Sequence, residues 1–299
     1  MNIIEDLRVL AGDNNVIENE PMSKHTTFRI GGKADVFITP DSDKSLFACV
    51  EYVKNRNIPY YIIGNGSNLL VRDNGFRGVI IQLYKNFSDI KVKDNIITAK
   101  AGALLSSAAK TAMNNSLSGM ECLSGIPGTI GGAICMNAGA YGGEMKDIVV
   151  ETKVINNGKF ETISNEDSEF GYRKSRIMAE NMIVVETVIK LEKGSKEDIQ
   201  AKMSELLVQR NSKQPVELPS AGSTFKRPEG YFAAKLIDDS GLRGFSVGQA
   251  QVSPKHCGFV VNNGGSTAKE VIELMDKVSQ KVYEKFGVKL EPEVRIIGE

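Results

Sequence analysis

The segment A-G-S-T-F-K-R-P, residues 221–228, holds the side chains of this sequence that are best arranged for chemistry. Ser223 follows a glycine, and the cations Lys226 and Arg227 come three and four residues later. A serine that attacks a substrate needs a base within hydrogen-bond reach, and neither of the two histidines lies in a motif typical of such a pair. A distant residue could still supply that base. Two roles therefore stay open for Ser223, a nucleophile and a proton donor.

Two further side chains fit chemistry on an anionic substrate. Arg173, in a G-Y-R sequence, is permanently charged and can hold a carboxylate through two parallel hydrogen bonds. Glu293 begins an otherwise apolar strand pattern. Arg176 and Glu291 are their near neighbours and the rival choices. Because serine, arginine and glutamate cannot supply a hydride, a reduction at this site would need a redox cofactor.

Glycine is concentrated in two segments, residues 62–71 and 124–144. Such loops let the backbone approach a ligand closely and let successive N–H groups converge on an anion. Their side-chain donors are Ser67, Asn68, Thr129 and Asn137. The first segment continues as a strand pattern, so it fits neither a Rossmann nor a Walker loop, which both open a helix. The pair of loops suits a pyrophosphate.

The segments that must position these residues alternate between the apolar pattern of helices and the pattern of strands. The helix at 195–212 is predicted to be amphipathic through Ile199, Met203, Leu206 and Leu207. The helix at 267–286 opens with the capping box T-A-K-E and stops at Gly287. Because strands also follow one another directly, we predict an α+β fold. The other predicted helices are 42–57, 104–115 and 231–239, and the predicted strands are 60–63, 69–71, 78–83, 95–101, 182–191, 257–261 and 290–298.

Composition narrows the partners. The 299 residues include 37 basic and 37 acidic ones, which gives no electrostatic footprint for nucleic acid or for an anionic membrane. No run of about 18 apolar residues is present, and the first residues do not form a signal peptide. The four cysteines form no C-x-x-C pair, which is typical of reduced thiols. We expect a cytoplasmic monomer with no metal site.

The glycine segments resemble the flavin-binding loops of the FAD-binding family typified by vanillyl-alcohol oxidase. Together with G-Y-R-K-S-R, A-G-S-T-F-K-R-P and L-E-P-E-V-R-I-I-G, they resemble the UDP-N-acetylenolpyruvoylglucosamine reductase (MurB) family, in order and in spacing, from about His25 onward. The resemblance implies a two-part FAD-binding domain, residues 1–82 and 83–205. A smaller α+β substrate-binding domain, residues 206–293, would follow, and the strand at 294–299 could return to the first part.

The resemblance also implies non-covalent FAD, with NADPH as the co-substrate. NADPH would reduce the flavin, and flavin N5 would then pass hydride to the double bond of UDP-N-acetylglucosamine enolpyruvate, giving UDP-N-acetylmuramate for peptidoglycan synthesis. The cofactor-binding residues that it implies are Ile63, Gly64, Asn65, Gly66, Ser67, Asn68, Leu69, Gly125, Ile126, Pro127, Gly128, Thr129, Gly131, Gly132, Asn137, Ala138 and Gly139.

Hydride addition to an unsaturated carboxylate leaves an enolate-like carbanion, and the resemblance implies that Ser223 protonates it while Arg173 and Glu293 assist. The substrate-binding residues that it implies are Tyr172, Lys213, Lys226 and Arg227. Two departures stand out. Some members have an asparagine where this chain has Arg227, and the short spacing between Arg173 and Ser223 is typical of the form that lacks an inserted tyrosine loop.

Two other functions fit the same loops. A flavin-dependent oxidase or dehydrogenase of a small alcohol or sugar is one, although relatives of that kind often attach flavin through a histidine, and His25 and His256 lie outside the glycine segments. A non-catalytic flavin- or nucleotide-sugar-binding protein is the other.

Overall fold

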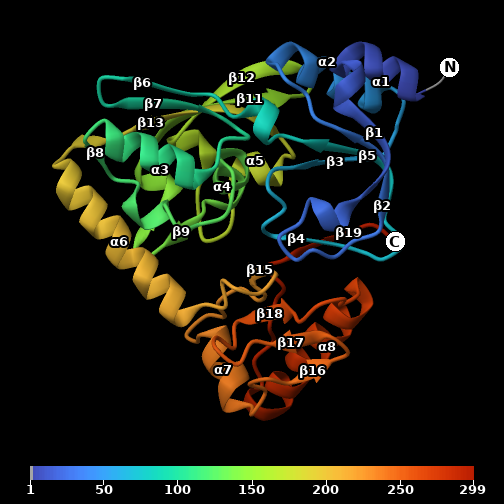
Figure 1. Cartoon of the computed structure of the whole chain (residues 1–299), viewed down its shortest axis with the longest axis vertical. Coiled ribbons are helices and arrows are strands. Elements are labelled where there is room, and N and C mark those ends of the chain that lie inside the picture. The colour runs from blue at the N-terminus through green and yellow to red at the C-terminus, as the bar shows by residue number, and fades with distance from the viewer. Residues whose placement is uncertain (1–2) are drawn as a thin grey trace. The chain divides into compact units, whose positions relative to one another are not determined.

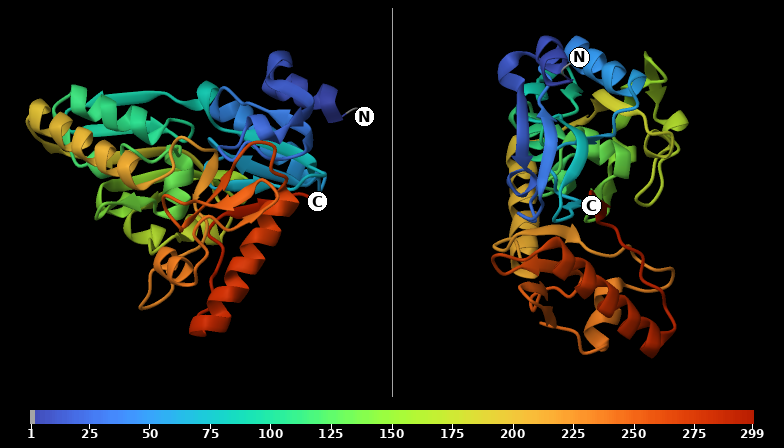
Figure 2. Two further views of the ribbon diagram at one scale, coloured as in Figure 1. Left: turned by 60° about the horizontal axis from the view of Figure 1, so that its bottom comes forward. Right: turned by 90° about the vertical axis from the view of Figure 1, so that its right-hand side faces the viewer.

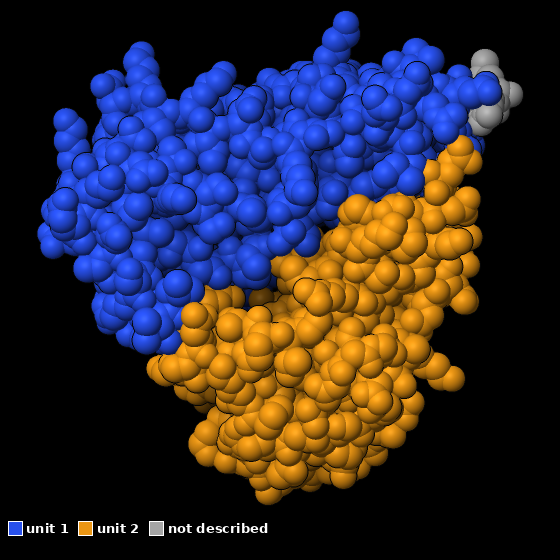
Figure 3. All heavy atoms as spheres, in the orientation of Figure 1, with its two compact units in different colours: residues 1–17, 36–65, 79–209 blue, residues 18–35, 66–78, 210–299 orange. Residues whose placement is uncertain are grey.

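The computed structural model describes residues 3–299, and its mixed helices and strands form the predicted α+β fold. The chain divides into two compact units (Figure 3). Unit 1 comprises the described chain up to Ile17, then residues 36–65 and 79–209, whereas unit 2 comprises residues 18–35, 66–78 and 210–299. Each unit therefore gathers segments that lie far apart in the sequence. The three-part division at residues 82, 205 and 293 stays a prediction.

A five-stranded antiparallel sheet is the centre of unit 1, with the strand order β12-β11-β13-β7-β6. Figure 1 shows α3 and α4 lying along this sheet, and both helices pack against β7. These elements are β6 (Ile90–Lys93), β7 (Ile96–Lys100), α3 (Leu105–Asn114), α4 (Ile130–Met136), β11 (Val149–Asn156), β12 (Lys159–Ser164) and β13 (Ile183–Lys190).

A second sheet has the order β1-β2-β5-β3, and β3 runs parallel to β5. Strands β1, β2 and β5 each pass from one unit into the other. The predicted helix at 42–57 is confirmed as α2, which the Ser42 hydroxyl caps by accepting the N–H of Ser45 at 3.2 Å. The elements are α1 (Ile3–Ala11), β1 (Val16–Pro21), β2 (Lys33–Ile38), α2 (Asp43–Asn55), β3 (Tyr60–Ile63) and β5 (Phe76–Gln82).

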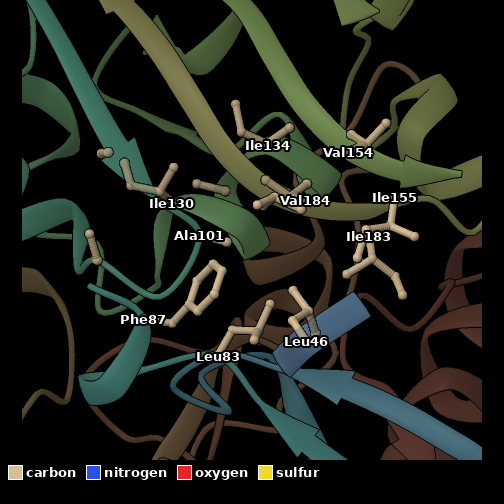
Figure 4. Close-up of a cluster of buried hydrophobic side chains, with 14 of the residues drawn as sticks. Leu46, Leu83, Phe87, Ala101, Ile130, Ile134, Val154, Ile155, Ile183 and Val184 are labelled. Atoms are coloured by element: carbon tan, nitrogen blue, oxygen red, sulfur yellow. The ribbon is translucent and has the colours of Figure 1, made fainter. Parts of the chain in front are cut away.

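The core of unit 1 joins α2 and α4 to the strands of the large sheet (Figure 4). Branched aliphatic side chains dominate it, as expected where helices pack on a sheet. Burial of this apolar surface is the main favourable term in folding. The labelled members of the cluster are Leu46, Leu83, Phe87, Ala101, Ile130, Ile134, Val154, Ile155, Ile183 and Val184.

Helix α6 (Lys196–Lys213) begins in unit 1 and ends in unit 2. Its predicted apolar face is only partly right. Ile199 and Leu206 are buried, but the Leu207 side chain is 52% exposed. Leu207 follows Leu206 directly, so a step of 100° around the helix carries it off the buried face.

Unit 2 contains a four-stranded sheet in the order β15-β18-β17-β16. Helix α8 is the long helix of unit 2 in Figure 2, and it packs against β16, β17 and α7. The elements are β15 (Ser220–Ser223), α7 (Ala233–Asp239), β16 (Ser246–Val247), β17 (Ala250–Val252), β18 (Phe259–Asn262) and α8 (Ala268–Phe286).

The ends of α8 confirm the predicted signals. Thr267 and Glu270 form the capping box, and Gly287 takes the left-handed conformation with φ 66°. The N-terminus has a further cap that the sequence did not predict. Both carboxylate oxygens of Asp73 accept N–H groups of the first turn, from Ala268 at 2.8 Å and Lys269 at 2.9 Å.

The predicted strand at 290–298 is wrong in its length. Only β19 (Arg295–Ile297) is a strand, and it runs parallel to β4 (Leu69–Val71). Residues 291–293 instead lie alongside residues 224–226. The remaining short elements are β8 (Leu117–Ser118), β9 (Gly139–Ala140), β10 (Gly143–Glu144), α5 (Arg176–Ala179), β14 (Glu192–Lys193) and the 3₁₀ turns Asp13–Asn15, Met22–Lys24, Lys85–Phe87, Glu121–Leu123, Met145–Asp147 and Glu166–Ser168. Within residues 3–299 there is no helix both long and apolar enough to cross a bilayer.

Candidate active site

The two glycine segments meet in unit 1. The side-chain amide of Asn65 donates a hydrogen bond to the carbonyl oxygen of Pro127 at 2.7 Å. A Cβ atom at Gly64 would lie 2.1 Å from Oγ1 of Thr129, so only glycine fits there without displacement. The buried amide of Gln82 fixes the same loop, because it donates to the Gly64 carbonyl at 3.0 Å. The predicted pairing of the loops is therefore present in the fold.

The first loop presents a run of unused backbone donors. Among the described residues, the N–H groups of residues 64–68 donate no hydrogen bond to the protein. Gly66 has a φ of 62°, and a Cβ atom there would lie 2.1 Å from the carbonyl oxygen of His25. Residues 25–27 therefore pack against this loop at Gly66, while the N–H groups of residues 64–68 stay available to a ligand. That arrangement is typical of an anion-binding nest.

The second loop uses its N–H groups differently. Ile130 and Gly131, at the start of α4, donate to the carbonyls of Ala103 and Ala101, both at 2.8 Å. These two donors are therefore not available to a ligand. Gly132 is exposed, and a Cβ atom there would meet only Thr129 Oγ1, at 3.7 Å. An open face at this glycine leaves room for a flat ligand to approach the backbone.

Asn137 ends α4 in the left-handed conformation, with φ 41°, and its side chain is fully buried. Its amide nitrogen donates to Glu144 Oε2 at 2.9 Å and to the Gly171 carbonyl at 3.2 Å. Its amide oxygen accepts the N–H of Lys146 at 2.9 Å. Every donor of this side chain is engaged inside the protein. These contacts favour a structural role for Asn137 over the direct cofactor contact expected from the sequence.

Arg173 lies in a tight turn of unit 1. The turn is closed by two backbone hydrogen bonds between Gly171 and Lys174, at 3.0 and 3.3 Å. Arg173 has a φ of 55°, a conformation that glycine or asparagine usually takes. Its guanidinium lies 5.1 Å from the ring centroid of Tyr172, whose side chain is 47% exposed. The two predicted site residues of this segment are therefore stacked on one turn.

A carboxylate stands close to this turn. Burial on its own would raise the pKa of Glu144, but hydrogen bonds from Lys146 and Asn137, with the charges of Lys146 and Arg173, hold that pKa below its ordinary value. Lys146 Nζ lies 3.0 Å from Glu144 Oε2. Glu144 is consequently ionised at neutral pH and attracts the guanidinium of Arg173.

Ser223 lies on a β-bulge of unit 2. Ser220 lies opposite Val261 and Ser223 opposite Phe259, so three steps along β15 match two along β18. The extra residue is accommodated at Gly222, which has a φ of 73° and open space where a Cβ would be. Bulges turn side chains out of a sheet beside active sites. The Ser223 side chain is exposed and, among residues 3–299, its hydroxyl makes no hydrogen bond to either histidine or to any other group.

The structure separates Glu293 from its rival. The Glu293 N–H donates to the carbonyl of Thr224 at 2.8 Å, so Glu293 lies opposite the residue that follows Ser223. Glu291 is 68% exposed, and its carboxylate pairs with Lys226 at 3.2 Å. The Glu293 residue is half-buried. The backbone of Glu293 therefore lies closer to Ser223 along the paired segments than that of Glu291, and the catalytic role of Glu293 stays a prediction.

Of the other predicted substrate-binding residues, Lys213 and Arg227 are exposed and Lys226 is half-buried. Lys213 ends α6, and the guanidinium of Arg227 lies 4.6 Å from the ring centroid of Phe232. Ser223, Glu293, Lys213, Lys226 and Arg227 belong to unit 2, whereas Arg173, Tyr172 and the second glycine loop belong to unit 1.

Comparison with known proteins identifies two domains along the chain. The family model for an FAD-binding domain matches residues 34–164, and the model for the UDP-N-acetylenolpyruvoylglucosamine reductase C-terminal domain matches residues 214–297. The UDP-N-acetylenolpyruvoylglucosamine reductase of Clostridioides difficile (strain 630) is 50% identical over 282 residues, which are 94% of this chain and 93% of that protein. The chain belongs to the UDP-N-acetylenolpyruvoylglucosamine reductase family. The resemblance stated from the sequence is confirmed.

Other members support the same assignment. The reductase of Clostridium botulinum (strain Hall) is 48% identical over 299 residues, with 100% of this chain and 97% of that protein covered. The crystal structure of the Thermus caldophilus reductase is similar, with a TM-score of 0.81 and 36% identity. The similarity covers 93% of this chain and 98% of that one.

The family's FAD fits the residues present. The unused N–H groups of residues 64–68 suit the pyrophosphate of FAD, and the open face at Gly132 leaves space against the backbone. Sequence reasoning missed two supports of this site, namely Gln82 and residues 25–27. Gln82 was detectable as a polar residue that ends an apolar strand. Residues 25–27 act on a segment far away in the sequence, and no local signal reveals them.

Proposed function

We propose that this protein is an NADPH-dependent flavoprotein oxidoreductase that reduces UDP-N-acetylglucosamine enolpyruvate to UDP-N-acetylmuramate. The observation that carries the proposal is 50% identity, over nearly the whole chain, to a protein named for this reductase activity. The exposed hydroxyl of Ser223, turned out of its sheet by a bulge, is the local feature that supports it. Both substrates are soluble nucleotide derivatives, so we propose a cytoplasmic location. A monomer is proposed as well, from the sequence resemblance alone.

The residues that would hold FAD are those of the two glycine loops, with the pyrophosphate on the N–H groups of residues 64–68. When bound, FAD supplies the redox chemistry, taking electrons from NADPH and giving hydride to the enolpyruvyl double bond. The remaining steps belong to the protein. Arg173 binds the substrate carboxylate, and the charge of its guanidinium stabilises the negative charge that the hydride leaves on the carboxylate-bearing group.

Ser223 donates the proton that completes the reduction. The carbanion adjacent to the carboxylate is a stronger base than the serine alkoxide. The Ser223 hydroxyl can therefore give its proton to this carbon without a histidine. Glu293, across the strand pair from Thr224, assists this proton transfer. Lys226 and Arg227 follow Ser223 in the same segment and, with Lys213 and Tyr172, bind the anionic substrate.

The test separates the two half-reactions of the Ser223→Ala variant. Anaerobic NADPH should bleach the flavin at the wild-type rate, because that step needs no proton donor to carbon. Reoxidation by UDP-N-acetylglucosamine enolpyruvate should slow by about 10²–10⁴, the usual value of a general acid. Ser246→Ala, which alters an exposed serine of the same unit, should leave both rates unchanged.

The carboxylates provide a second comparison. Glu293→Gln should slow the reoxidation, whereas Glu291→Gln, which breaks only a surface ion pair with Lys226, should not. If Ser223→Ala reoxidises at the wild-type rate, Ser223 is not the proton donor. If the wild-type flavin is bleached by NADPH but never reoxidised by this substrate, the proposed function itself fails.

A further inference from the structure

The turn that carries Arg173 is held in an unfavourable conformation. Arg173 is the third residue of the turn Gly171–Lys174 and has a positive φ, which an arginine adopts only at a cost. A residue in such a conformation persists when its surroundings impose it. The contacts that flank the turn therefore show what holds Arg173 in place.

Both flanks of the turn are attached to the end of helix α4. On one side, the amide of Asn137 donates to the Gly171 carbonyl at 3.2 Å. On the other side, the hydroxyl of Ser175 donates to the carbonyl of Cys135 at 2.9 Å and accepts the N–H of Met178 at 3.1 Å. Asn137 is fully buried and Ser175 is 3% exposed, so water does not compete for these bonds.

The same short helix is continuous with the second glycine loop. Helix α4 begins directly after Thr129, which the Gly64 backbone contacts, and it ends at Asn137. Its Ile130 and Ile134 side chains are part of the unit 1 core. The turn of Arg173 is thus tied to the element that leaves the predicted flavin loop, and not to a mobile surface segment.

We propose that Asn137, together with Ser175, is a positioning residue that fixes Arg173 for the substrate half of the reaction. This inference rests on the proposed function, because it takes Arg173 to bind the substrate carboxylate. Asn137 does not touch the substrate. It acts by holding the Gly171 carbonyl, and through the Glu144 carboxylate it also places a negative charge near the guanidinium of Arg173.

The Asn137→Gly variant isolates the amide. Glycine accepts the left-handed conformation of residue 137 at no steric cost, so the helix end is kept while the side-chain bonds are lost. Asn157→Gly is the control for the backbone change, because Asn157 is also an asparagine of unit 1 with a left-handed φ, of 44°, but its side chain is exposed. Ser175→Ala is a second, independent test of the other flank.

The first readout needs no catalysis. Hydrogen exchange of residues 170–176, measured on the FAD-loaded protein, should become about tenfold faster in Asn137→Gly and in Ser175→Ala, the factor expected for one or two lost net hydrogen bonds. It should not change in Asn157→Gly. Unchanged exchange at residues 170–176 in Asn137→Gly would show that Asn137 does not hold the turn of Arg173, whatever reaction the enzyme performs.

The second readout is kinetic. Asn137→Gly should leave flavin reduction by NADPH unchanged and slow reoxidation by the enolpyruvyl substrate at least tenfold. In an Arg173→Ala background the same substitution should change reoxidation by less than twofold, because a residue that acts through Arg173 has nothing left to position. A full additional loss in that background, or a weaker affinity for FAD, would show that Asn137 acts elsewhere. Failure of the wild type to reoxidise would refute the proposed function. The hydrogen-exchange result would then still decide whether Asn137 and Ser175 hold the turn of Arg173.

Discussion

The contact between Gly64 and Thr129 allows a sharp test of the loop pair. In Gly64→Ala, the new Cβ would lie 2.1 Å from Thr129 Oγ1 and 3.0 Å from its Cγ2. Ordinary contact between such atoms is about 3.5–4.0 Å, so one loop must move by more than about 1 Å. Rotating the threonine does not help, because both branches of its side chain are close and Thr129 is only 2% exposed.

The expected cost follows from this overlap. Overpacking of a buried site costs about 1–3 kcal/mol, and displacement of the loop also strains the hydrogen bonds from Asn65 to Pro127 and from Gln82 to Gly64. We expect the free energy of unfolding of the FAD-free protein to fall by about 2 kcal/mol. For a folding unit of about 150–250 residues, such as unit 1, that corresponds to a decrease of about 4–8 °C in Tm. FAD affinity, measured by fluorescence titration, should fall by about tenfold or more.

A double-mutant cycle on the FAD-free protein decides whether the overlap is the cause. Thr129→Ala removes Oγ1 and Cγ2, so it should cost at least about 1 kcal/mol less in the Gly64→Ala background than in the wild type. Gly132→Ala is the control, since its Cβ has no neighbour closer than 3.7 Å, and this helical position should gain stability or stay unchanged without FAD. If the Gly64 and Thr129 effects add within about 0.5 kcal/mol, the two loops do not touch as described.

Two further expectations concern stability. Asp73→Ala removes both caps from the first turn of α8 and should lower the free energy of unfolding by about 1–2 kcal/mol, as measured by urea denaturation; no change would mean that the cap is not formed. Burial raises the pKa of Asp43, but hydrogen bonds from Lys100 and Lys153 outweigh it, so the folded-state pKa lies below the unfolded value near 3.8. The resulting stability is present above that value and lost as pH falls through the folded-state pKa. In Asp43→Asn the free energy of unfolding should depend less on pH in this acidic range, and an unchanged pH dependence would contradict the lowered pKa of Asp43.

Much of the local structure could be predicted from the sequence because its signals are local. The helix at 267–286 was delimited by its capping box and by Gly287, and both are present at the ends of α8. The composition of the two glycine segments indicated a pair of ligand-binding loops, and the fold brings them together through Asn65 and Pro127. In each case the chemistry of a few adjacent residues determines the conformation.

The features that the sequence did not reveal share a different cause. Nothing in the sequence shows which way the Asn137 amide points, and only the fold reveals that it is buried against Glu144 and Gly171. The strand expected at 290–298 is shortened because residues 291–293 pair with a distant segment. Asp73 caps a helix that begins 195 residues later. These features depend on contacts between segments that are remote in the sequence, and the periodicity within one segment does not indicate such contacts.

The pairing of β4 with β19 has a consequence for biosynthesis. Strand β4 follows the first glycine loop directly, yet its parallel partner consists of residues 295–297. The backbone of Glu299 is also hydrogen-bonded to Asn74 and Gly75. A nascent chain on the ribosome must therefore carry a finished first loop beside an unpaired strand until residues 295–299 emerge. Ribosomes that stall or terminate before this point would release chains in which β4 has no partner strand, and such chains are expected targets for chaperones and proteases.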